Sequence, residues 1–203
     1  MAIQTIAESG LIVCPPTTAW FRFQDCASFQ PLKKVGVAEM DVGFVAADGK
    51  QRWLVELRDF SHSGNPDGFA VAESVERMQQ EFVTKAKDSL LVLGSMWHSL
   101  PYGPQLAGDI PSDFQQRPTE ANRLRLAFVV KTDEPRRFRA SVQPIQDKLR
   151  NRIQGQPELL GVRKFCDVFL WDHEMAIESG LPIAVNDAAK PSQRATKALG
   201  LRG

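Results

Sequence analysis

The fold of this chain is decided by residues 38–60, which read AEMDVGFVAADGKQRWLVELRDF. Polar and apolar residues alternate on both sides of Asp48-Gly49, and a period of two is typical of strands with one polar and one apolar face. Asp-Gly is the preferred pair for the two-residue type I′ turn that joins antiparallel strands. The sequence therefore predicts a β-hairpin within residues 35–60, with its turn at Asp48-Gly49.

The turn also determines which residues face one another, because directly opposed pairs are symmetric about Asp48-Gly49. Asp41 then lies opposite Glu56, and Glu39 lies opposite Arg58. Side chains alternate between the two faces of a strand, so these four charged residues share one face. The other face of the predicted hairpin carries Met40, Val42, Phe44, Val55 and Leu57.

The opposed acids, Asp41 and Glu56, are the unusual feature of this hairpin, because like charges directly across a strand pair destabilise a sheet. Three arrangements would relieve the repulsion: exposure on a solvated face, neutralisation by nearby bases, or a shared divalent cation. Mg²⁺ suits such a pair because it takes oxygen ligands and often combines one or two carboxylates with phosphate oxygens. Lys85, on the helix expected after the hairpin, is either an ordinary surface lysine or a base that points toward the acids.

The remaining pattern predicts an α/β fold with a mixed central sheet flanked by helices. After a strand expected at 19–23 and the hairpin, the pattern predicts a long amphipathic helix from Val71 to Gly94 and a long loop at 98–122. A buried strand at 124–130, a helix from Pro144 to Gly155 and a strand at 162–171 follow, which favours parallel pairing in the second half. We expect one domain over residues 1–183 and a basic C-terminal tail over 184–203.

Composition excludes several classes of protein. The 203 residues include 25 Lys and Arg against 24 Asp and Glu, so no overall charge excess indicates nucleic acid or membrane binding. Three widely spaced cysteines favour neither a disulfide framework nor a zinc cluster, and His62, His98 and His173 lack metal-ligand spacing. Nucleotide-binding glycine motifs, the GxSxG elbow, HExxH and CxxC are all missing from the sequence. Without an apolar run of membrane-spanning length, we expect a cytoplasmic protein with no membrane partner.

Asp41 together with Glu56-Leu57-Arg58 resembles the PD-(D/E)XK motif of the restriction-endonuclease-like nucleases, over roughly residues 35–132. The resemblance implies the restriction-endonuclease-like fold and a Mg²⁺ cofactor, with Mn²⁺ as a substitute. It also implies that Asp41 and Glu56 are metal ligands and that the main-chain carbonyl of Leu57 completes the set. Lys85 matches a helix position that often reaches such sites, and Glu8 is the candidate for a third carboxylate.

Arg58 departs from the motif, which has lysine at this position. The arginine guanidinium stays protonated and cannot act as a general base, although it binds phosphate charge well. Arg58 is therefore either part of the catalytic set or the partner of Glu39 in a cross-strand ion pair.

The segment from Arg117 to Arg152 has a local excess of basic residues that could bind nucleic acid without sequence preference, or could be a solvated surface. Within it, Arg136, Arg137 and Arg139 are the candidate nucleic-acid contacts. The leading expectation is a Mg²⁺-dependent DNA endonuclease of bacterial defence or DNA repair. The alternatives are a catalytically weakened subunit that binds DNA or assembles with protein partners, and a module whose acidic face binds a basic protein.

Overall fold

The computed structural model describes residues 5–61, 72–156, 159 and 161–186. Its strands are β1 (Ile6–Glu8), β2 (Leu11–Val13), β3 (Trp20–Phe21), β4 (Val42–Val45), β5 (Arg52–Asp59), β6 (Leu124–Lys131), β7 (Cys166–Asp172) and β8 (Ile183–Val185). Its α-helices are α1 (Gln30–Lys34), α2 (Ala72–Trp97), α3 (Gly103–Ala107), α4 (Ser112–Gln115), α5 (Pro135–Gln154) and α6 (His173–Glu178). The expected turn at 65–68 and His62 lie outside the described residues.

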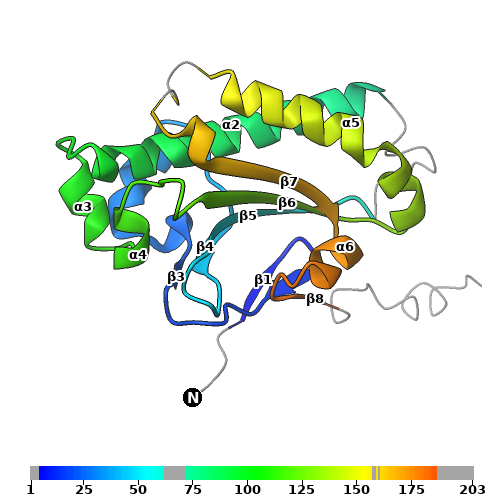
Figure 1. Ribbon diagram of the computed structural model, residues 1–203, viewed down its shortest axis with the longest axis horizontal. Helices are drawn as coiled ribbons and strands as arrows, with labels where there is room; N and C mark the ends of the chain where they lie inside the picture. The colour runs from blue at the N-terminus through cyan, green and yellow to red at the C-terminus, as the bar shows by residue number, and fades with distance from the viewer. Residues whose placement is uncertain (1–4, 62–71, 157–158, 160, 187–203) are drawn as a thin grey trace, which may run out of the picture.

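The central sheet has five strands in the order β3-β4-β5-β6-β7. Strands β3, β4 and β5 pair antiparallel, whereas β5-β6 and β6-β7 pair parallel. This arrangement confirms the α/β class and the mixed sheet, with parallel pairing in its second half. Helices α2 and α5 lie side by side on one face, and β1, β8 and α6 lie on the other (Figure 1).

The hairpin register is the expected one, with Val42 opposite Val55 and Val45 opposite Arg52. The turn itself differs from the predicted type I′ turn. Ala46 N donates to the Gln51 carbonyl at 2.8 Å, so the loop is four residues long, and within it only Gly49 has a positive φ, at 68°. The register survives because the longer loop is also centred on the Asp48-Gly49 bond.

The helices depart from the sequence expectations at their ends. Helix α2 continues through Gly94 to Trp97, and α5 begins at Pro135 rather than Pro144, which lies inside it. Proline is favoured in a first helical turn, and Pro135 satisfies that preference nine residues earlier than expected. The predicted loop at 98–122 contains α3 and α4, whose apolar residues Leu106 and Phe114 are fully buried.

Two apolar clusters hold the layers together. The larger lies between the sheet and α2 and α5, and includes Leu54, Phe82, Phe128, Phe138 and Leu149. The smaller lies on the opposite face, against β1, β2, β8 and α6, and includes Val42, Phe44, Val55, Leu57 and Ala176. Strand β8 pairs with β2 and extends beyond residue 183, whereas most of the expected basic tail, 187–203, lies outside the described residues.

Gly43 in β4 packs against the ring of Phe21, and a Cβ atom there would overlap the ring. Phe21 is 4% exposed and packs edge-on against Phe23 and Phe114, so it has no room to move. We therefore expect Gly43→Ala to lower the free energy of unfolding by about 1–3 kcal/mol.

The matched control is Gly94→Ala, because a Cβ at Gly94 in helix α2 meets no atom within 4 Å. There the same substitution is expected to stabilise the protein by roughly 0.4–1 kcal/mol through the lower entropy of the unfolded chain. Urea denaturation of both variants tests the pair, and equal effects of the same sign would contradict the packing argument.

Candidate functional site

The site lies at the carboxyl end of β5. The neighbouring strand β4 begins at Val42, opposite Val55, so beyond Val55 strand β5 has a gap on its β4 side. Asp41 occupies this gap: its Oδ2 accepts a hydrogen bond from Leu57 N at 2.7 Å and so continues the strand pairing with a side chain. The preceding residues do not form the expected strand, because they are bound to helix α2. Met40 N donates to Ser89 Oγ at 2.9 Å, and Ala38 N donates to Asp88 Oδ2 at 3.0 Å.

This anchoring corrects the predicted face of Met40. It was expected beside Val42 and Phe44, but it is completely buried in the core under α2, on the other side of the sheet. The strict alternation of the hairpin stops at Val42, since the chain leaves the sheet there to reach the helix.

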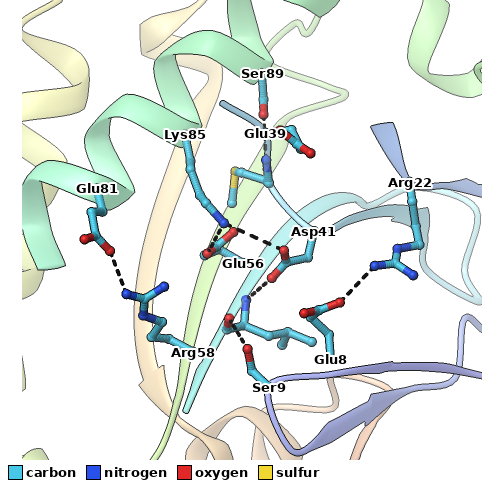
Figure 2. A network of polar contacts seen from close by, with 12 residues as sticks. Glu8, Ser9, Arg22, Glu39, Asp41, Glu56, Arg58, Glu81, Lys85 and Ser89 are labelled. Atoms are coloured by element: carbon cyan, nitrogen blue, oxygen red, sulfur yellow. Dashed lines mark hydrogen bonds and ion pairs between the residues drawn. The ribbon is translucent and has the colours of Figure 1, made fainter. Parts of the chain in front are cut away.

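The two acids nevertheless meet, and Lys85 joins them (Figure 2). Lys85 Nζ lies 2.6 Å from Glu56 Oε1 and 3.8 Å from Asp41 Oδ1. Glu56 is only 1% exposed, and the Asp41 side chain is 15% exposed. The interpretation of this face as solvated is therefore wrong at Asp41 and Glu56.

Burial, reinforced by the charge of Asp41, raises the pKa of Glu56 to about 8. Burial likewise raises the pKa of Asp41, although Lys85 and the Leu57 N–H act in the opposite direction. Burial alone would lower the pKa of Lys85, but the adjacent Glu56 and Asp41 carboxylates raise it overall. Near neutral pH the ammonium group of Lys85 thus stays charged while Glu56 readily holds a proton.

Arg58 does not pair with Glu39, which corrects the expected cross-strand ion pair. Glu39 binds Lys33 at 2.9 Å, and Arg58 NH2 lies 2.9 Å from Glu81 Oε2 on α2. The predicted opposition of Glu39 and Arg58 fails because residue 39 lies outside the strand, where Ala38 and Met40 are fastened to the helix.

The turn between β1 and β2 closes the site from the other side. Ser9 Oγ donates to the Leu57 carbonyl at 3.0 Å, and Glu8 accepts from Arg22 NH2 at 2.9 Å while facing Asp41 (Figure 2). Glu8, the candidate third carboxylate, is the last residue of strand β1. Ser9 has a φ of 49°, an uncommon conformation for a residue other than glycine, which aims its hydroxyl at β5.

Beside the predicted Lys85, helix α2 supplies two residues that the sequence patterns did not indicate, Glu81 and Ser89. Glu81, Lys85 and Ser89 follow one another at four-residue steps, so they lie along one face of the helix and contact Arg58, Glu56 and Met40 N respectively. The spacing is visible in the sequence. However, polar residues at such steps usually indicate a solvent face, and only the packing of α2 on β5 turns this one inward.

The donor atoms partly fit a hard divalent cation. Glu56 Oε2 is buried without a hydrogen-bond partner among the residues that the structure describes, and such an atom is costly unless a cation or a proton satisfies it. Within the same residues Asp41 Oδ1 makes only the long contact with Lys85, whereas Asp41 Oδ2 and the Leu57 carbonyl are already bonded once. No cluster of three His, Cys, Asp or Glu side chains suited to a metal occurs among the described residues. A bound Mg²⁺ would therefore keep several waters, as is usual for this ion.

The basic segment at 117–152 does not form a free basic strip. Arg139 binds Asp172 through two nitrogens and also contacts Glu174, and Arg137 contacts Glu134. Other members are bound by acids elsewhere in the fold, as in the pairs Arg123–Asp167, Lys131–Asp59, Lys148–Glu76 and Arg152–Glu76. Of the three candidate nucleic-acid contacts, Arg139 thus supports the start of α6, and Arg136 remains exposed at the start of α5.

Over the described ranges, no helix combines the length and apolar character needed to cross a membrane. Comparison with known proteins finds no matching family model, no similar curated protein and no similar solved structure.

Proposed function

We propose that this protein is a Mg²⁺-dependent nuclease that hydrolyses DNA phosphodiester bonds, on a restriction-endonuclease-like variant of the mixed α/β sheet. The observation that carries the proposal is the meeting of Asp41, Glu56 and Lys85 at the end of β5, with one Glu56 oxygen buried and unpartnered within the described part of the chain. A cytoplasmic role in bacterial defence or DNA repair, alone or within a larger complex, fits such an activity.

In this proposal Asp41 Oδ1, Glu56 Oε2 and the Leu57 carbonyl would hold the ion. Mg²⁺, or Mn²⁺ in its place, would lower the pKa of a nearby water and screen the phosphate charge. Hydrolysis forms a bond from the water oxygen to phosphorus, breaks the bond to the leaving oxygen, and transfers a proton of the attacking water to that oxygen.

The two bases have separate tasks. Lys85, beside both acids, orients the attacking water and stabilises the added negative charge. The Arg58 guanidinium cannot accept a proton from the attacking water, so its contribution is restricted to binding phosphate. Ser9, Asp88 and Ser89 hold the main chain on either side of the acids in place.

The test is incubation of plasmid and linear DNA with the protein in Mg²⁺, in Mn²⁺ and in EDTA, beside the Asp41→Ala variant. We expect cleavage by the wild-type protein only with the metals, and a loss of about 10³-fold or more in the variant, because one of two carboxylate ligands is gone. Circular dichroism verifies that Asp41→Ala is folded. Cleavage that persists in both Asp41→Ala and Glu56→Ala contradicts the assignment.

A second candidate is a nuclease-fold subunit that binds DNA or partner proteins without efficient cleavage. The observation in its favour is that both bases are already engaged, Lys85 with Glu56 and Arg58 with Glu81. Two measurements separate the candidates: calorimetric titration with Mg²⁺ and Mn²⁺, and DNA affinity with and without chelator. The absence of metal binding, together with a DNA affinity that chelator leaves unchanged, favours the subunit.

A further inference from the structure

Arg58 occupies the rim of the candidate site. It is two residues beyond Glu56 on β5, so both side chains project toward α2, but Glu56 is buried whereas the Arg58 side chain is 43% exposed. Arg58 is therefore placed between the buried acids and the solvent from which a substrate would arrive.

The contact that holds Arg58 is a weak one. A single guanidinium nitrogen meets Glu81 Oε2, and the Glu81 side chain is itself 36% exposed. Exposed ion pairs of this kind contribute little to stability, with a median of about 0–1 kcal/mol. A phosphate group can replace the carboxylate at small cost, because guanidinium binds phosphate through two parallel hydrogen bonds.

Glu81 is not left alone when Arg58 departs. Its other oxygen, Oε1, accepts from Arg77 Nε at 3.3 Å, one turn earlier on the same helix. The carboxylate therefore keeps a cationic partner in either state, which removes the usual penalty for breaking an ion pair.

The space beside this contact is open. A groove of about 640 Å³ runs along α2 and is lined by Arg77, Glu81, Thr84 and Lys85, among others. It brings the Glu81 carboxylate and the Lys85 stem within reach of the same bound molecule.

We propose that Glu81 restrains Arg58 in the free protein, and that Arg58 leaves Glu81 to bind a backbone phosphate of the nucleic acid next to the candidate metal site. The inference rests on the proposed function and adds a restraint to it: Glu81 is a positioning residue that acts only through Arg58. Removal of Glu81 should tighten DNA binding, but only while Arg58 is present.

The test is a double-mutant cycle with Glu81→Gln, Arg58→Gln and the double variant. Binding of a fluorescein-labelled DNA duplex is followed by anisotropy in EDTA over a series of KCl concentrations. We expect Glu81→Gln to raise affinity about two- to fivefold, the equivalent of a weak surface ion pair. Arg58→Gln should lower affinity and reduce the slope of log Kd against log salt by about one, since one phosphate contact is lost.

The cycle separates a restraint on Arg58 from simple charge repulsion. If Glu81 acts through Arg58, its removal gives no gain in the Arg58→Gln background, whereas a gain that persists there overturns the inference. Glu76→Gln is the matched control, because Glu76 lines the same groove but binds Lys148 and Arg152. Its effect should be the same with and without Arg58.

Failure of the inference is distinguishable from failure of the proposed function. Metal-dependent cleavage by the wild-type protein, together with a salt slope that Arg58→Gln leaves unchanged, overturns the restraint alone. A wild-type protein that neither binds the duplex nor cleaves DNA overturns both.

Discussion

Glu56→Gln is expected to abolish divalent-cation binding. In the metal-free protein it should also remove a decrease in stability that the wild type shows as the pH rises. Both effects come from one buried carboxyl group whose pKa is raised to about 8 by burial and by Asp41. Glutamine keeps the shape of the side chain and an oxygen that accepts from Lys85, but it cannot ionise.

The direction of the pH effect follows from the number of protons that the folded and unfolded states bind at Glu56. Glutamate in the unfolded chain has a pKa near 4.5, so between pH 4.5 and about 8 the folded protein binds more protons than the unfolded chain at this position. Stability is therefore complete below this window and decreases as the pH rises through it. The decrease is on the order of 5 kcal/mol, because each pKa unit between 4.5 and about 8 corresponds to about 1.4 kcal/mol and the raised pKa already contains the opposing effect of Lys85. Asp41, whose pKa is also raised, leaves a smaller slope in the variant.

Urea denaturation of both proteins in EDTA, at a series of pH values, measures this effect. Glu39→Gln is the matched control, since Glu39 lies near the same segment of chain but binds Lys33 near the surface. Equal pH slopes for wild type and Glu56→Gln would show that Glu56 is ionised at no cost in the fold.

The metal effect is measured by calorimetric titration with Mg²⁺ and Mn²⁺. Protons compete with cations for Glu56, so wild-type affinity should increase up to about pH 8, and Glu56→Gln should show no binding at any pH. Metal binding by Glu56→Gln that equals the wild type would exclude Glu56 as a ligand.

Arg52→Met is expected to lower the free energy of unfolding by about 3 kcal/mol, the largest effect on stability away from the site. Arg52 begins β5 and is only 2% exposed. Its guanidinium donates to the main-chain carbonyls of Asp113, Gln116 and Asn122, at 3.0, 2.6 and 2.9 Å. Methionine fills a similar volume but leaves these carbonyls without a donor.

Two effects oppose each other when Arg52 is replaced: the loss of its hydrogen bonds and the removal of a buried charge. Burial lowers the pKa of Arg52, and replacing a buried charge with an apolar side chain is sometimes stabilising. Here the three carbonyls belong to the chain segment that follows α3, so we expect their loss of hydrogen bonds to dominate.

Arg125→Met provides the comparison, because Arg125 is half-buried and donates to a single side chain, Gln51. It should cost about 1 kcal/mol or less. Hydrogen exchange should show faster exchange of α4 in Arg52→Met alone. If Arg52→Met were as stable as the wild type, water molecules would have to donate the hydrogen bonds that the three carbonyls lose.

Local sequence patterns were sufficient to predict the hairpin, α2, β6 and the parallel half of the sheet. Alternation around Asp48-Gly49 fixed the hairpin register, because any loop centred on that bond gives the same pairs. Spacing of apolar residues located α2 and β6, and the order of elements fixed parallel pairing in the second half of the sheet. The approach of Asp41 to Glu56 follows from the same register. The pattern left Lys85 either as a surface lysine or as a base beside the two acids, and the structure places it beside them.

Tertiary structure alone decided which charges are paired, because ion pairs depend on distances between segments far apart in the chain. It detached residues 38–41 from the strand, gave Arg58 to Glu81 instead of Glu39, and bound Arg139 to Asp172. It also closed the site with Ser9 and Ser89, whose hydroxyls are ordinary in the sequence and acquire a role only beside the end of β5 that β4 does not cover. Local patterns specify elements and register, whereas the partners of polar groups are set by packing, since burial makes an unpaired group too costly to leave.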